Sequence, residues 1–101
     1  MSNIEIYKSI EEGIKACFGE LVTIKDESYV SGGDINEARC ICLSNDEKVF
    51  VKMNSIEKSG FFEAEEIGIN AIAATDTIQV PKLLFRGKDK TTGKSFLAMQ
   101  Y

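Results

Sequence analysis

The chain has 101 residues, which is enough for one small domain with a single modest core. Twelve basic residues against sixteen acidic ones give a formal net charge of −4, and no cluster of Lys and Arg stands out, so we expect neither nucleic acid nor an anionic membrane as a partner. No apolar run approaches the roughly 20 residues that a membrane-spanning helix needs. The first residues lack the basic and apolar regions of a signal peptide, and we therefore expect a cytoplasmic protein.

The cysteines do not indicate a disulfide framework or a metal site. Cys17, Cys40 and Cys42 are an odd number of thiols, and the chain has no histidine. Three scattered thiols without histidine do not make a typical four-ligand zinc site, so no metal site is predicted. We interpret the cysteines as small, partly buried side chains in a reducing compartment. The missing histidine also excludes a Ser–His or Cys–His catalytic system within these residues.

A helix is predicted at the start of the chain, over residues 2–18. Gly19 stands where a glycine C-cap belongs, and Ser2 with Glu5 matches a capping box. The apolar positions that recur at helical spacing are Tyr7, Ile10, Ile14 and Cys17.

The rest of the chain alternates in the manner of strands, with one further helix. That helix is predicted over residues 61–74, with an apolar stripe made by Phe62, Ile69, Ile72 and Ala73. The predicted strands are 21–24 with 28–30, then 36–43, 48–53, 83–86 and 95–99, the last two joined by a turn at 89–93. This order predicts an α+β fold, in which an antiparallel five-stranded sheet packs against two helices as a single domain over residues 1–101.

The end of the chain is apolar. Residues 96–101 read as a core strand with no polar tail behind it. Because natural domains seldom end within a core strand, we expect this chain to be the first part of a longer protein.

A glycine turn lies between the first two predicted strands. Gly32 and Gly33, which precede Asp34, have no Cβ, so backbone N–H groups could approach phosphate oxygens closely there. The alternative is an ordinary β-hairpin corner.

A lysine and a glutamate form the second candidate site. Lys52 ends the strand sequence Val-Phe-Val-Lys and offers a point charge for phosphates, the alternative being a lysine that faces solvent. Glu65 lies three residues after Phe62 and four before Ile69, on the apolar stripe, so its carboxylate needs a partner, for which Lys52 is the natural choice. Glu63 is the second choice for this pair, and Glu66 is expected to face solvent.

These segments, taken in order, resemble the fructosamine/ketosamine kinase family over nearly the whole chain. The matching stretches are residues 30–38, 49–54, 62–65 with 71–73, and Val80-Pro81. The resemblance implies the small, ATP-binding lobe of a protein-kinase-like fold, related to aminoglycoside and choline kinases. In that family ATP phosphorylates a sugar hydroxyl of ketoamine adducts on lysine or protein amines, which is a deglycation step.

The resemblance also implies roles for single residues. Gly32, Gly33 and Asp34 become the phosphate loop, Lys52 binds phosphate and Glu65 holds Lys52. Met99, Gln100 and Tyr101 fall at the end of the last strand, where the adenine-contacting hinge begins.

The same resemblance places the remaining machinery in the large lobe. The catalytic aspartate, the Mg²⁺ ligands and the ketoamine-binding groove belong there, so we expect no catalytic residue and no activity in residues 1–101 alone. We also expect this segment to self-associate through the apolar hinge-side surface, with Phe96, Leu97, Met99 and Tyr101 at or near the contact. Two alternatives stay open, namely the small lobe of an aminoglycoside or choline kinase-like phosphotransferase, and a non-catalytic α+β interaction module.

Overall fold

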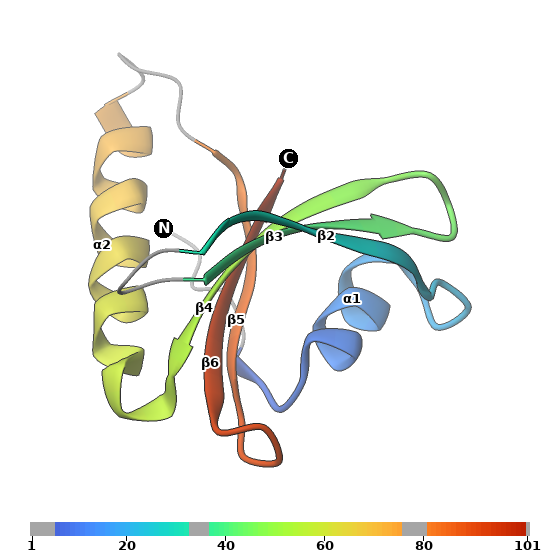
Figure 1. The fold of residues 1–101 in the computed structure, drawn as a ribbon. Helices are drawn as coiled ribbons and strands as arrows, with labels where there is room; N and C mark the ends of the chain where they lie inside the picture. The colour runs from blue at the N-terminus through green and yellow to red at the C-terminus, as the bar shows by residue number, and fades with distance from the viewer. Residues whose placement is uncertain (1–5, 33–36, 76–80, 101) are drawn as a thin grey trace.

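The computed structural model describes residues 6–32, 37–75 and 81–100. Its two α-helices lie on opposite faces of one curved sheet, with α2 along one face and α1 against the other (Figure 1). The predicted α+β fold is thereby confirmed. In chain order the elements are β1 (Ile6–Tyr7), α1 (Ile10–Phe18), β2 (Ile24–Gly32), β3 (Glu37–Leu43), β4 (Lys48–Ser55), the 3-10 turn η1 (Ile56–Lys58), α2 (Ser59–Thr75), β5 (Leu83–Asp89) and β6 (Lys94–Gln100).

The sheet has six strands in the order β1-β5-β6-β4-β3-β2, so the prediction of five antiparallel strands is wrong. The additional strand is β1, which pairs in parallel with β5 through Ile6 opposite Arg86 and Tyr7 opposite Gly87. The other neighbouring strands pair antiparallel. Gly87 permits the close approach of β1, because a Cβ built there would stand 2.2 Å from the backbone oxygen of Tyr7.

The first helix is shorter than predicted. It begins at Ile10, because Ser9 is the N-cap and its hydroxyl accepts a hydrogen bond from the backbone N–H of Glu12 at 3.1 Å. Gly19 is the C-cap, as predicted, with φ 119°. The expected capping box at Ser2 and Glu5 lies outside the described residues. Helical spacing alone therefore placed Tyr7 in the wrong element, although its ring does pack edge-on against Phe85.

The second strand is one continuous element, β2, that begins only at Ile24. Residues 21–23, predicted as strand, lie outside it, and Leu21 is 94% exposed. The predicted strands 36–43, 48–53, 83–86 and 95–99 are all present, with residue 36 outside the described residues, and β4, β5 and β6 extend beyond their predicted ends. The turn between β5 and β6 is also confirmed, with Gly93 at φ 73° and its N–H donating to the backbone oxygen of Asp89.

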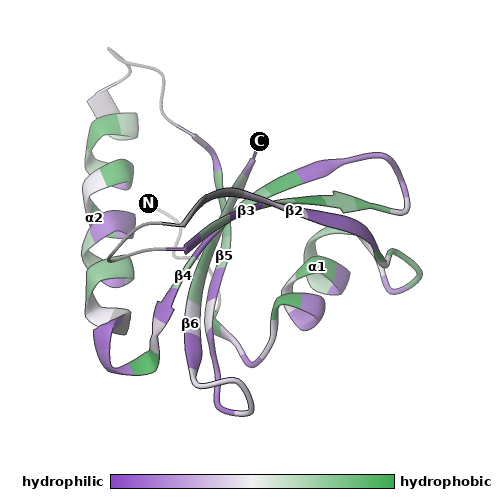
Figure 2. Ribbon diagram, in the orientation of Figure 1, coloured by the Kyte–Doolittle hydropathy of each residue, from purple (hydrophilic) through white to green (hydrophobic). Residues whose placement is uncertain are grey.

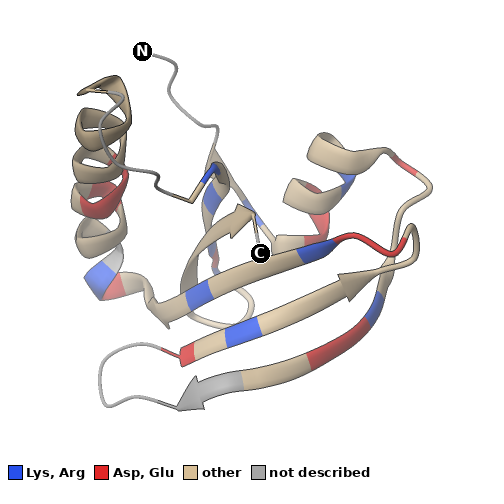
Figure 3. Ribbon diagram, turned by 90° about the horizontal axis from the view of Figure 1, so that it is seen from above, with Lys and Arg blue, Asp and Glu red and all other residues tan. Residues whose placement is uncertain are grey.

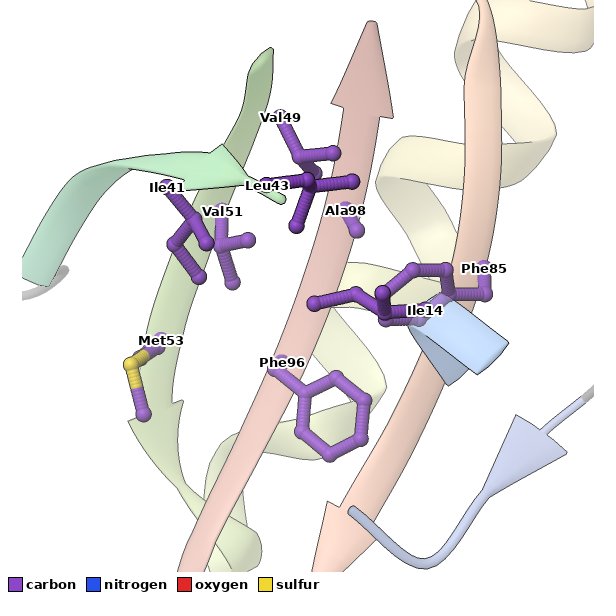
Figure 4. Packing of buried hydrophobic residues seen from close by; sticks show 9 residues of the cluster. All are labelled: Ile14, Ile41, Leu43, Val49, Val51, Met53, Phe85, Phe96 and Ala98. Atoms are coloured by element: carbon purple, nitrogen blue, oxygen red, sulfur yellow. The ribbon is translucent and has the colours of Figure 1, made fainter. Parts of the chain in front are cut away.

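The larger hydrophobic core lies between the sheet and α1. Phe85 and Phe96 meet edge-on in its centre, with ring centroids 6.0 Å apart, and Ile14 of α1 packs beside them (Figure 4). Strands β3, β4 and β6 contribute the remaining side chains, each pointing to this face at alternate positions. The core consists of Ile14, Ile41, Leu43, Val49, Val51, Met53, Phe85, Phe96 and Ala98.

The smaller core lies on the opposite face, under α2. Phe62 of α2 packs with Leu97 and Met99 of β6, and Phe50 and Leu83 border this cluster. Hydrophobic residues nevertheless continue around much of α2 (Figure 2), and Phe61 and Ile67 are 64% and 60% exposed. The predicted apolar stripe is therefore only partly correct, since Ile69 is half-buried while residues 72 and 73 are exposed.

None of the helices in the described part of the chain is long and apolar enough to cross a membrane.

Candidate functional site

Strand β4 places Lys52 on the α2 face of the sheet. Val49, Val51 and Met53 are buried in the core on the α1 side, so the alternating Phe50 and Lys52 must point to the other face. Phe50 does border the cluster under α2. The predicted orientation of Lys52, with Phe50 and opposite Val51, is therefore confirmed.

Lys52 and Glu65 form an ion pair between β4 and α2. The Nζ atom of Lys52 donates to Oε2 of Glu65 at 2.9 Å, and the two side chains are 30% and 28% exposed. Partial burial makes this pair stronger than a solvated surface pair, because water screens the charges less. Glu63, the second choice for the partner, is exposed. The prediction that Glu65 faces Lys52 is confirmed. In Figure 3 the acidic positions of α2 are red and the basic positions of the sheet are blue.

A row of three side chains crosses the sheet beneath α2. Lys52 of β4 and Arg86 of β5 are both register partners of Leu97, on the central strand β6. Phe62 of α2 packs with Leu97, over the middle of the row. The two cations therefore lie on either side of the apolar contact between Phe62 and Leu97, through which α2 packs on the sheet.

A second ion pair completes this row. The Nε atom of Arg86 donates to Oε1 of Glu66 at 3.2 Å, and the side chains are only 11% and 8% exposed. The prediction that Glu66 faces solvent is wrong. Glu66 lies four residues after Phe62, so it belongs to the same helical stripe as Glu65. Two signals could have indicated the pair, namely that spacing and the position of Arg86 directly after the buried Phe85, on the opposite face of β5.

An open cavity of about 400 Å³ adjoins the ion pair on this face of the sheet. Its walls are mostly apolar, with the Lys52 ammonium as the one charged group among the lining residues. Volume and lining suit a flat heterocycle with a negatively charged substituent, since such sites combine apolar walls with a few polar groups. The lining residues are Phe50, Lys52, Pro81, Met99 and Gln100.

The predicted hinge residues are placed in part. Met99 and Gln100, at the end of β6, line this cavity. The backbone N–H of Gln100 is already used, because it donates to the backbone oxygen of Lys82 at 2.8 Å. That amide is therefore not free to bind a base in this conformation. Tyr101 lies outside the described residues.

The predicted phosphate loop is described only at its edge. Gly32 is the last residue of β2 and pairs with Glu37 of β3, which confirms that the two strands approach each other there. Gly33 and Asp34 lie outside the described residues, so their role stays a prediction.

Three residues expected at a self-association contact are buried within the chain itself. Phe96, Leu97 and Met99 are 0%, 0% and 4% exposed. Their side chains therefore offer little surface to a second copy, because helices α1 and α2 pack on the two faces of β6. Self-association through other residues stays a prediction.

Burial also tunes a thiol on the α2 face. Cys40 is opposite Phe50 in the β3–β4 register and is 8% exposed. Burial, and to a smaller degree the neighbouring Cys42, raises the pKa of the Cys40 thiol.

Within residues 6–32, 37–75 and 81–100, no three His, Cys, Asp or Glu side chains converge so as to hold a metal ion.

A separate polar cluster surrounds Arg39 on the α1 face. Its guanidinium pairs with Glu37 at 2.6 Å and Glu27 at 3.2 Å, and it lies 4.9 Å from the centre of the Tyr29 ring. Burial alone would lower the pKa of Arg39, but the hydrogen bonds that its guanidinium donates to both carboxylates outweigh burial and raise it. The Arg39 guanidinium is paired with two carboxylates and an aromatic ring. None of these residues lines the cavity beside Lys52.

Comparison with known proteins connects this geometry to one family. The model of the family described as fructosamine kinase matches residues 6–101. A Synechocystis protein named "Probable ketoamine kinase" is 34% identical over 95 residues, covering 94% of this chain and 31% of its own. The chloroplastic "Protein-ribulosamine 3-kinase" of Oryza sativa subsp. japonica is 34% identical over 83 residues, covering 82% and 24%.

A solved structure agrees with the sequence matches. The crystal structure of a Haemophilus somnus protein, named "Putative fructosamine-3-kinase", superposes with a TM-score of 0.79 at 32% identity, covering 95% of this chain and 32% of that one. The chain thus spans about a third or less of the length of these relatives. The family match, the fold and the Lys52–Glu65 pair agree, and the chain belongs to the fructosamine kinase family.

Proposed function

We propose that this chain is the ATP-binding part of a kinase that phosphorylates ketoamine adducts, a deglycation reaction. The observation that carries the proposal is the ion pair of 2.9 Å between Lys52 and Glu65 beside the cavity under α2. In protein kinases a strand lysine, held by a helix glutamate, must be in place before phosphoryl transfer proceeds. The names of the relatives supply the substrate class.

The residues present fit ATP. Phe50 and Met99 offer apolar surface for the purine, and Lys52, at the same cavity, offers an ammonium to the α- and β-phosphates. Glu65 neutralises and orients that ammonium, so the lysine is held extended toward the cavity instead of folding back to solvent. Gly32, Gly33 and Asp34 are proposed to close over the phosphates with their backbone N–H groups.

Catalysis needs more than these residues provide. Mg²⁺ would neutralise the charge that develops on the transferred phosphoryl group, and a carboxylate would orient the attacking hydroxyl. The described residues offer no cluster that fits a metal ion. We propose that the metal ligands and the substrate groove belong to the other part of a protein as long as its relatives, and that residues 1–101 alone do not catalyse the transfer.

The test uses the full-length protein. Purified enzyme is incubated with ATP and fructoselysine, and in parallel with kanamycin and with choline, while phosphate transfer is followed. We expect transfer to fructoselysine alone, and a loss of about 1000-fold or more in kcat/KM for Lys52→Met, because a charge contact at the transferring phosphates is removed. Transfer to kanamycin or choline would reassign the substrate. Absence of nucleotide binding in the full-length protein would favour the interaction module.

A further inference from the structure

The two carboxylates at the inner face of α2 hold the helix on both sides of one apolar contact. Glu65 reaches Lys52 on β4, and the next residue, Glu66, reaches Arg86 on β5. Phe62 packs between them with Leu97, whose strand separates β4 from β5. Successive helical residues project about 100° apart, so the two pairs engage different strands from one turn of the helix.

This arrangement restricts rotation of α2 about its own axis. An apolar contact such as that of Phe62 tolerates small rotations, because dispersion and burial are not directional. An ion pair with hydrogen-bond geometry does not, and two pairs on opposite sides oppose rotation in both senses. The apolar contact area under α2 is small, since Phe62 is the only α2 residue among the core clusters of the described residues.

The Arg86–Glu66 pair is the more buried of the two and lies away from the cavity. Its side chains are 11% and 8% exposed, against 30% and 28% for Lys52 and Glu65. Neither Arg86 nor Glu66 lines the cavity of about 400 Å³. Buried ion pairs often contribute little net stability relative to apolar side chains of the same size, and in some proteins they specify one geometry.

We infer that Arg86 and Glu66 are positioning residues for nucleotide binding, which fix the rotation of α2 so that Glu65 stays on Lys52. The inference deepens the proposed function and rests on it for its kinetic consequence. Its structural consequence, the distance between Lys52 and Glu65, does not require the protein to be a kinase.

The test replaces the pair by apolar side chains of similar length, as Glu66→Met/Arg86→Met in the full-length protein. The double variant should fold, because such replacements of buried ion pairs are often neutral or stabilising. Crystal structures of wild type and variant give the distance between Lys52 Nζ and Glu65 Oε2. We expect it to exceed 4 Å in the variant, beyond the ion-pair limit, and a distance that stays near 2.9 Å overturns the inference whatever the activity.

Kinetics provide the second readout. We expect kcat/KM for ATP to fall by about 10- to 100-fold in the double variant, as for a misplacement of about 1 Å, with the KM for the ketoamine unchanged. In the Glu65→Gln background the same two substitutions should cause no further loss, because their effect passes through Glu65. An equal loss in both backgrounds, or a wild-type value in the double variant, overturns the inference.

A control separates charge removal as such from positioning. Lys25 pairs with Asp46 at 3.6 Å, and both side chains are largely exposed, at 65% and 87%. Lys25→Met should leave kcat/KM and the Lys52–Glu65 distance unchanged. If wild-type protein fails to transfer phosphate at all, the proposed function fails, and the crystallographic distance still decides the inference.

Discussion

Lys52 and Arg86 are cross-strand neighbours of the same residue, Leu97, one on each side of it. Each pairs with one of two consecutive glutamates of α2. The sheet thus presents a cation, an apolar side chain and a second cation in one row, and the helix presents the complementary set. This match of charge and shape favours one orientation of α2 on the sheet. The cavity that we assign to ATP lies beside Lys52.

Glu65 and Glu63 offer a matched pair for testing the assignment of the helix glutamate. We expect Glu65→Gln to lower kcat/KM for ATP by about 10-fold or more, because the amide no longer holds the Lys52 charge in place. Glu63 is exposed, and Glu63→Gln should stay within about twofold of wild type. Steady-state kinetics at several ATP concentrations measure both. A larger loss for Glu63→Gln would reassign the role.

The two cations should differ in their contribution to stability. Removing Lys52 leaves a glutamate that is 28% exposed and can recover part of its hydration, so Lys52→Ala should lower the free energy of unfolding by about 1 kcal/mol. Removing Arg86 takes a charged hydrogen-bond donor from Glu66, whose side chain is only 8% exposed, so Arg86→Ala should cost more, about 1.5–3 kcal/mol. Urea denaturation compares the two, and an equal loss would contradict the burial argument.

Periodicity was sufficient to predict the Lys52–Glu65 pair but not the other one. The strand period separates Lys52 from Val51, and the helix period puts Glu65 on the stripe of Phe62 and Ile69. Glu66 satisfies the same rule, four residues after Phe62 and three before Ile69. The helix period alone therefore cannot choose between Glu65 and Glu66. Both face the sheet, because each has a cationic partner on a different strand.

The features that the sequence did not reveal depend on contacts between distant segments. Tyr7 fits a helical stripe and Ile6 lies within the predicted first helix, yet both pair with residues 86–87, about 80 positions away. The local sequence holds no sign of that partner, whereas the Ser9 cap at the start of α1 is a local signal. Arg86 likewise acquires its role only because the order of the sheet brings β5 under α2.

Gly13 and Gly68 should respond to alanine in opposite directions. A Cβ on Gly13 would stand 2.4 Å from the buried ring of Phe85, so Gly13→Ala should cost about 1–3 kcal/mol through overpacking. Gly68 is in the interior of α2 with nothing within 4 Å of a built Cβ, and Gly68→Ala should stabilise by about 0.5–1 kcal/mol. Thermal unfolding measures both, and a stabilised Gly13→Ala would refute the packing of α1 on β5.

Stability should depend on the ionisation of Cys40 at alkaline pH. Burial raises the pKa of this thiol above its ordinary value of 9.0. When the pH rises above that value, the thiol in the unfolded chain loses its proton while the folded one keeps it. The contribution of Cys40 to the free energy of unfolding is therefore complete below pH 9 and is lost as the pH rises toward the folded pKa.

Other groups also titrate in this range, so the measurement is a difference between two proteins. Between pH 8 and 10 the free energy of unfolding should fall more steeply in wild type than in Cys40→Ala. Parallel curves for the two proteins would show that the thiol ionises equally well in the folded chain, which would contradict the burial of Cys40 at 8% exposure.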